Sequence, residues 1–208
     1  MTQKQKHSSI QDIANATRII ISELYNKGNI KTYILTDLRV AKDFQSRRAR
    51  KIWSYLFPAL DDDLFKSKVQ KGYAIKAIFS ALKIYAFYQQ SRPQLTSASS
   101  FGEKHEGKSL FEAFGTFSEG SDYEKTITKR VNEILIQDDF NVMYHDMTHL
   151  LILCKSYGLN SKIDFPRLAA DFYLYQQSQD GSGTVCLRWG EQFYHLNNKD
   201  DQSEQEND

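Results

Sequence analysis

Cysteine is scarce in this sequence. The 208 residues contain two cysteines, Cys154 and Cys186, which lie 32 positions apart and belong to no CxxC pair. A disulfide-stabilised secreted domain needs several cysteines at short spacings, so the sequence excludes that class. We expect both side chains to be buried thiols in a reducing cytosol, and Cys154 to belong to the core rather than to act as a nucleophile.

Proline and glycine are also rare, with 3 and 10 residues respectively. A β protein rich in tight turns uses more of both, so their scarcity favours long helices. The most apolar stretch, residues 73–88, is interrupted by Lys76 and Lys83, whereas a membrane span needs about 18 consecutive apolar residues. The N-terminal residues also form no apolar signal, so the sequence predicts a soluble cytoplasmic protein with no membrane partner.

Neither sign of charge dominates the whole chain, because 27 lysines and arginines offset 26 acidic residues. The distribution is nevertheless uneven. Residues 197–208 contain five acidic residues and one lysine, a net charge of −4, which leaves +5 on residues 1–196. An acidic, amide-rich segment has too few apolar side chains to fold, so we expect residues 197–208 to form a disordered tail.

Apolar residues recur at helical spacing through most of residues 1–196. The first helix is predicted to start at Ser9, which with Asp12 resembles a capping box, and to stop at Asn26–Gly28. The same spacing predicts helices over residues 31–42, 46–57, 67–90, 127–136, 143–154 and 164–175, and a short amphipathic turn over residues 108–117. Residues 176–183 form a predicted turn, and residues 184–196 fit either a short hairpin or a helix. The predicted fold is an all-α helical bundle, which the polar linker 91–107 allows to divide into two lobes, 1–96 and 104–196.

The strongest local feature is a basic run. Residues 27–51 carry eight lysines and arginines against two aspartates, a net charge of +6. Guanidinium groups bind phosphate oxygens in a forked geometry and displace counterions, so such a run is typical of contact with a nucleic-acid backbone. The alternative is a solvated surface whose charges pair with acids elsewhere in the fold. The residues predicted to contact nucleic acid are Lys31, Arg39, Arg47, Arg48, Arg50 and Lys51.

Weaker basic groups occur further along the chain. Lys76 and Lys83 share one flank of a predicted helix, and Lys129 and Arg130 are adjacent on another. Each pair is either a second set of nucleic-acid contacts or ordinary surface. Arg188 precedes a tryptophan, so it either contacts nucleic acid or stacks on the indole ring in a structural role.

A metal site is one alternative function. His145 and His149 stand at positions i and i+4, a spacing at which two imidazoles on a helix can bind zinc. Asp146 stands where the zincin pattern has a glutamate base, and no third ligand is evident at a suitable spacing. The pair is compatible with a metal-dependent hydrolase or with a helix–helix contact. No GxSxG sequence or Walker loop is present, so we expect a protein without enzymatic activity or cofactor.

Several segments share a pattern with a known family. They are SYGLNSKIDF at 156–165, LAADFYLYQ at 168–176, VCLRWGEQFY at 185–194, AIFSALKIYAFYQQS at 77–91, HEG at 105–107 with SL at 109–110 and Ala113, and the basic residues 28–39. Together they resemble the CasB family, the small subunit of the type I-E CRISPR surveillance complex called Cascade. The resemblance spans residues 28–194.

The resemblance implies a helical protein that does not cleave its target. Two copies of the family's proteins pack head to tail inside the complex, beside other Cascade subunits, and help to hold guide RNA, target strand and displaced strand. A separate nuclease-helicase degrades the target. The partners implied for this chain are other Cascade subunits, the backbones of CRISPR RNA and target DNA, and a second copy of itself. A protein–protein scaffold without nucleic-acid contact is the other alternative.

The charge asymmetry generates a prediction for the tail. An acidic segment can mask basic residues before they meet a polyanion. Deletion of residues 197–208 is expected to raise the affinity for a short single-stranded DNA at low salt, measured by fluorescence anisotropy. Unchanged affinity would show that the tail masks nothing.

Overall fold

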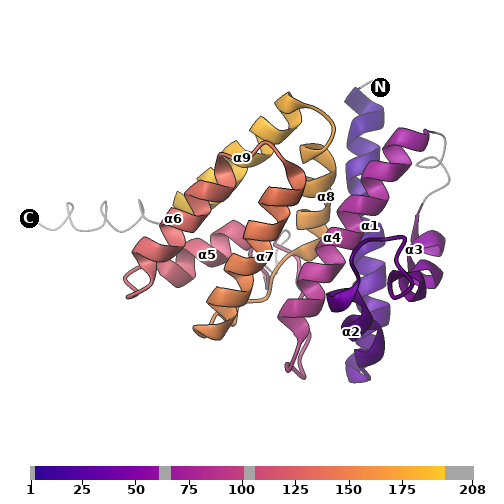
Figure 1. Ribbon diagram of the computed structural model, residues 1–208, viewed down its shortest axis with the longest axis horizontal. Coiled ribbons are helices and arrows are strands. Elements are labelled where there is room, and N and C mark those ends of the chain that lie inside the picture. Colours follow the sequence, from indigo (N-terminus) through magenta and orange to yellow (C-terminus); the bar gives the residue numbers. More distant parts are fainter. Residues whose placement is uncertain (1–2, 61–66, 101–105, 195–208) are drawn as a thin grey trace, which may run out of the picture.

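The computed structural model describes residues 3–60, 67–100 and 106–194 (Figure 1). Over these residues it contains nine α-helices and two short 3-10 helices, and it shows no strand. The all-α prediction is therefore confirmed. The acidic residues 197–208, predicted to form a tail, lie outside the described residues.

The helices follow one another through short connections. Their bounds are α1 Gln3–Tyr25, η1 Asn26–Gly28, α2 Thr32–Val40, η2 Ala49–Ile52, α3 Trp53–Ala59, α4 Lys68–Gln89, α5 Leu110–Ser118, α6 Glu124–Leu135, α7 Phe140–Ser156, α8 Phe165–Tyr175 and α9 Gln179–Tyr194. Five of the predicted helices correspond to α2, α4, α6, α7 and α8 within a few residues, and the short turn predicted over residues 108–117 is instead the helix α5. None of the helices in the described part of the chain has both the length and the apolar content needed to cross a membrane.

Side-chain caps explain where several helices begin. Ser67, Ser109, Asp139 and Asp164 each accept a backbone N–H from the first turn of α4, α5, α7 and α8 respectively. Such a cap satisfies a donor that has no partner inside the helix. At the other end of α7, Gly158 adopts a φ of 110°, which only glycine reaches without strain. These local signals explain why the sequence pattern located α4, α7 and α8 well and placed a short element at α5.

Two predicted starts were wrong. Helix α1 begins at Gln3, ahead of the predicted start at Ser9. The single helix predicted over residues 46–57 is instead a turn followed by η2 and α3. The Asp43 carboxylate accepts the N–H groups of Gln45 and Ser46, and this side-chain turn competes with a helix cap at Ser46.

The hairpin alternative for residues 184–196 is excluded as far as residue 194, because α9 is a continuous helix. It begins at Gln179, inside the segment predicted as a turn. Val185, Trp189 and Phe193 recur every four residues and are all buried. The packing of this face overrides the preference of these residue types for strands.

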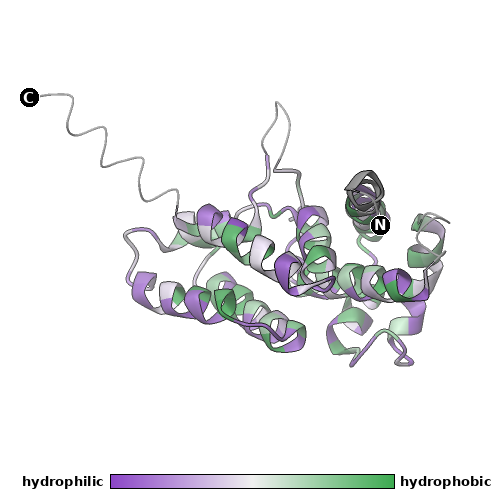
Figure 2. Ribbon diagram, turned by 90° about the horizontal axis from the view of Figure 1, so that it is seen from above, coloured by the Kyte–Doolittle hydropathy of each residue, from purple (hydrophilic) through white to green (hydrophobic). Residues whose placement is uncertain are grey.

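Helix α8 lies at the centre of the molecule, packed against α1 and α4 on one side and α9 on the other (Figure 1). The core is continuous from α1 to α9. Figure 2 shows helices that carry hydrophobic and hydrophilic residues on different sides, as amphipathic packing requires. Helices from both predicted lobes thus share one core, and the division at residues 91–107 stays a prediction.

The segment predicted as a linker is partly fastened to the start of α8. Ile163 makes isolated parallel bridges to both Ser97 and Lys108. The chain passes so close to itself there that a Cβ on Gly107 would lie 2.3 Å from the Ala98 carbonyl oxygen. Glycine is therefore required at position 107, which belongs to the HEG segment of the sequence.

A buried carboxylate links α8 to α9. The Trp189 Nε1–H donates to Asp171 Oδ2 at 2.7 Å, and the Arg188 guanidinium forms an ion pair with the same carboxylate. Burial raises the pKa of Asp171, and the positive charge of Arg188 opposes that rise. Arg188 therefore has a structural partner, the Asp171 carboxylate, where the sequence suggested stacking on the indole ring, and its contact with nucleic acid stays a prediction.

Replacing Asp171 tests this link. Asp171→Ala leaves two donors beside the core without an acceptor, so the free energy of unfolding in urea is expected to fall by roughly 3 kcal/mol. Glu191→Ala, an exposed change on α9, the other helix of this link, should stay within about 0.5 kcal/mol of the parent. Equal effects of the two changes would contradict a structural role for the carboxylate.

Candidate nucleic-acid interface

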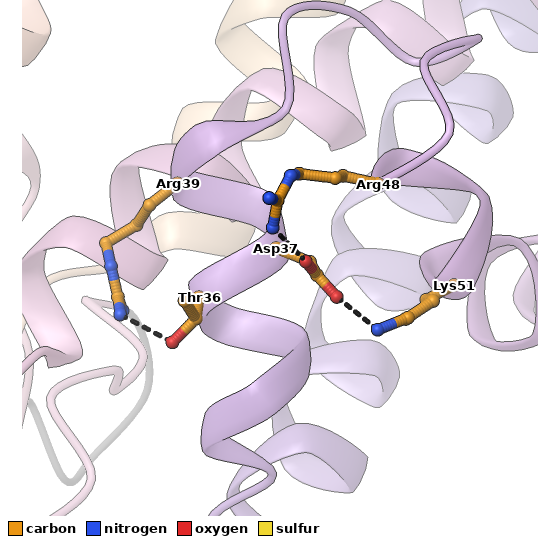
Figure 3. A network of polar contacts seen from close by, with 5 residues as sticks. All are labelled: Thr36, Asp37, Arg39, Arg48 and Lys51. Atoms are coloured by element: carbon orange, nitrogen blue, oxygen red, sulfur yellow. Dashed lines mark hydrogen bonds and ion pairs between the residues drawn. The ribbon is translucent and has the colours of Figure 1, made fainter.

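Two of the predicted contact residues surround one carboxylate. Arg48 and Lys51 approach Asp37 of α2 at 3.0 Å and 2.6 Å (Figure 3). The hydrogen bond from Lys51 is the main reason that the pKa of Asp37 is lowered from its ordinary value of 3.8, and Arg48 adds to it. The two cationic side chains remain 61% and 55% exposed, so one positive charge in excess still faces solvent.

Aromatic rings support other members of the basic run. The Lys31 ammonium lies 4.6 Å from the centre of the Tyr55 ring, and the Lys51 ammonium lies 5.8 Å from that of Tyr33. Such contacts hold a long side chain in place without neutralising it. Arg47 is exposed in the turn before η2. We call Lys31, Arg47, Arg48 and Lys51 the α2–η2 basic cluster.

Arg39 points away from this cluster, on the other side of α2 (Figure 3). Its guanidinium donates to the Thr36 hydroxyl and to the Ala86 carbonyl oxygen near the end of α4. Lys155 donates to two more carbonyl oxygens there, those of Phe87 and Gln90, each at 2.7 Å. Cations are favourable at the negative end of a helix dipole, so Arg39 stabilises α4 whatever else it contacts.

A cationic hollow lies between the η2–α3 segment and helices α4 and α7. Its volume is about 1050 Å³. Of the described residues that line it, four are lysines or arginines and one, Asp43, is a carboxylate. We call this hollow the basic groove. Its cations are Lys42, Arg50, Lys76 and Lys83, and its aromatic residues are Phe44, Trp53, Phe57, Phe79, Phe140 and Tyr144.

The two lysines of α4 are partly removed from water. Lys76 lies 4.4 Å from the centre of the Phe140 ring, and Lys83 lies 5.8 Å from that of Phe79. Burial lowers the pKa of both lysines, while the charges of Asp139 and Asp43 respectively act in the opposite direction. A partly desolvated ammonium gains more from an incoming anion than a fully hydrated one.

The remaining predicted contacts lie elsewhere. Lys129 and Arg130 belong to α6, at the opposite end of the long axis from α2 and α3 (Figure 1). Lys129 lies 4.0 Å from Glu133 one turn away. Arg188 borders a different hollow, of about 780 Å³, between α1 and α8. The structure thus brings Arg50, Lys76 and Lys83 together, and it separates these three from the α6 pair and Arg188.

His145 and His149 are both exposed on α7, and His145 borders the basic groove. The ring centres of His145 and His149 are 4.0 Å apart. Within the described ranges, no group of three His, Cys, Asp or Glu side chains could hold a metal ion. Cys154 is fully buried, and burial raises the pKa of its thiol to about 12, as expected for a core cysteine. Cys186 is only half-buried.

Sequence reasoning missed two parts of the basic groove. Lys42 belongs to the basic run but was not among the predicted contacts. Phe44, Trp53 and Phe57 were assigned no role, although Phe44 lies within the basic run and Trp53 and Phe57 directly follow it. Basic residues beside aromatic ones are typical of single-strand binding, and this proximity could have indicated the groove.

The fold and the groove define an all-helical protein with a cationic, aromatic-lined surface. A family model described as CRISPR-associated protein Cse2 matches residues 35–194. The chain therefore belongs to this family, whose members are also called CasB, and membership implies a subunit of the CRISPR Cascade complex.

A solved structure has the same fold. The crystal structure of CasB from Thermobifida fusca matches with a TM-score of 0.63 at 20% sequence identity. The match covers 89% of this chain and 97% of that one. A search of curated proteins finds no match.

The cations at the end of α4 generate a prediction for Lys155. Burial, with the nearby charges of Arg92 and Arg39, lowers the pKa of Lys155 from 10.5 to about 8. NMR titration with labelled lysine should show this value, and Arg92→Gln should raise it because one repelling charge is removed. Arg18→Gln on α1 is the control and should leave it unchanged. In the unfolded chain the Lys155 side chain keeps its proton up to a pH of about 10.5, whereas in the folded protein it loses the proton near pH 8. The free energy of unfolding therefore rises with pH between about 8 and 10.5. A Lys155 pKa near 10.5 in the folded protein would contradict the assignment.

Proposed function

We propose that this chain is a non-catalytic small subunit of a type I-E Cascade complex in the cytoplasm. In this role it binds nucleic-acid backbones without sequence specificity and stabilises the R-loop formed by guide RNA and target DNA. The observation that carries the proposal is the basic groove, where four cations face one carboxylate. Family membership supplies the CRISPR setting.

Backbone binding needs charge more than base-reading groups. Each phosphate that a lysine or arginine neutralises releases a counterion, and this release drives binding at low salt. Exchange of a DNA duplex for an RNA–DNA hybrid is nearly balanced in free energy, so modest contacts to a displaced strand can tip it. A groove of this kind would therefore favour the open R-loop without reading its sequence.

The proposed partners are other Cascade subunits, CRISPR RNA and target DNA, and a second copy of this chain. The α2–η2 basic cluster and the α6 pair, Lys129 and Arg130, are further surfaces where a backbone or an acidic neighbour could be bound. The histidine pair gives no support to the hydrolase alternative, because it lacks a third ligand within the described ranges.

Neutralising the groove tests the proposal. The triple variant Arg50→Gln, Lys76→Gln and Lys83→Gln is expected to weaken binding of single-stranded DNA by about tenfold or more. For a single strand, each neutralised phosphate adds about 0.7 to the steepness of the plot of log affinity against log salt concentration. Loss of three contacts should therefore make this slope shallower by about 2. Filter binding across a salt series measures both quantities.

The matched control removes three charges from α6, by Lys125→Gln, Lys129→Gln and Arg130→Gln. It should change the affinity much less if the groove carries the binding. A larger loss in the α6 variant would move the site to that helix. A parent protein whose affinity does not depend on salt would rule out the electrostatic mechanism altogether.

A further inference from the structure

We infer that the basic groove also binds unpaired nucleobases, by stacking them on an aromatic wall that holds Trp53 and Phe57. The inference rests on the proposed function and adds a ligand to it: the exposed faces of bases in a single strand, in place of backbone phosphates alone. The family comparison supplies no such site. It follows from the residues that line the groove.

The aromatic wall consists of Phe44 and the three rings packed around it. Phe44 lies 5.5 Å from Trp53, 6.1 Å from Phe57 and 5.7 Å from Phe79, measured between ring centres. The Trp53 Nε1–H donates to the Phe44 carbonyl oxygen at 3.1 Å, which fixes the orientation of the indole. Phe57 remains 38% exposed. A fixed ring that keeps an exposed face provides a stacking surface at little entropic cost.

Cations stand beside these rings. The Arg50 guanidinium lies 5.8 Å from the centre of the Trp53 ring, and the Lys83 ammonium lies 5.8 Å from that of Phe79. In a nucleotide, the separation between phosphate and base is similar to the separation between cation and ring in this groove. One strand can therefore place a base against the aromatic wall while its phosphate meets a cation, as in other single-strand grooves.

The ligand has to be unpaired, because a duplex hides both faces of each base within the stack. An acidic protein segment would match the charge of the groove but has no comparable planar surface. Bases of DNA and RNA share the chemistry needed, so a single strand of either kind can fill the site, and the choice between them is a matter for measurement.

The two tryptophans allow a direct test with the full chain. Trp189 is 1% exposed, so only Trp53 should respond to a ligand in the groove. Tryptophan emission is followed during titration with oligothymidylate, oligouridylate, an abasic deoxyribose-phosphate chain of equal length, and a glutamate-rich peptide of equal charge. Oligothymidylate or oligouridylate should quench the emission and bind about tenfold more tightly than the abasic chain, and the tighter of the two identifies the strand.

Two variants separate stacking from structure. Trp53→Phe keeps an aromatic ring, so it should retain the affinity but lose the quenching. Phe57→Leu should weaken binding of the oligonucleotides several-fold and leave the abasic chain unaffected. Unfolding midpoints of both variants in urea confirm that they are folded.

The outcomes distinguish the two claims. Equal, salt-sensitive affinity for oligonucleotide and abasic chain without quenching would overturn stacking and leave backbone binding intact. Quenching by the glutamate-rich peptide as strong as that by oligothymidylate would identify a docking site for an acidic protein segment and overturn the inference. If no polyanion binds, the proposed function and the inference both fail.

Discussion

Helix α8 loses most of its accessible surface by packing between α1, α4 and α9. Phe165 and Phe172 are fully buried there, and burial of one such side chain contributes about 1.5–3 kcal/mol. The same contacts fix the position of α4, which contributes Lys76 and Lys83 to the basic groove. The geometry of the groove therefore depends on a core that lies some distance behind it, and the Asp171 link extends this core to α9.

The cationic side chains lie in two kinds of environment. Around Asp37, two positive side chains share one carboxylate and are held at the surface. In the basic groove, the lysines of α4 lie on aromatic rings, and the carboxylates near them only partly offset their loss of hydration. These partly desolvated lysines are not fully neutralised, so a phosphate can bind them favourably. The basic groove is therefore a better candidate for a nucleic-acid site than the more exposed α2–η2 basic cluster.

Much of the fold could be predicted from the sequence, because caps such as Ser67 and Asp164 and apolar spacing act locally. The failures had two causes. At Ser46, a competing local turn around Asp43 replaced the predicted helix start. In α9, burial of Trp189 and Phe193 against the rest of the fold made a helix of a segment with β-rich composition. Among the candidate site residues, Lys76 and Lys83 were recognised as a pair on one flank of a helix. The sequence could not show that Arg50 joins them, because that depends on how η2 packs beside α4.

The position of Asp43 inside the basic groove has a kinetic consequence. A phosphate held beside Lys83 would also meet this negative charge, which repels it and shortens the lifetime of the contact. A groove of uniformly positive character would retain a strand for longer and resist its movement. With Asp43 in place, individual contacts would break and re-form readily, which would suit the proposed role of a subunit that lets a bound strand shift its position.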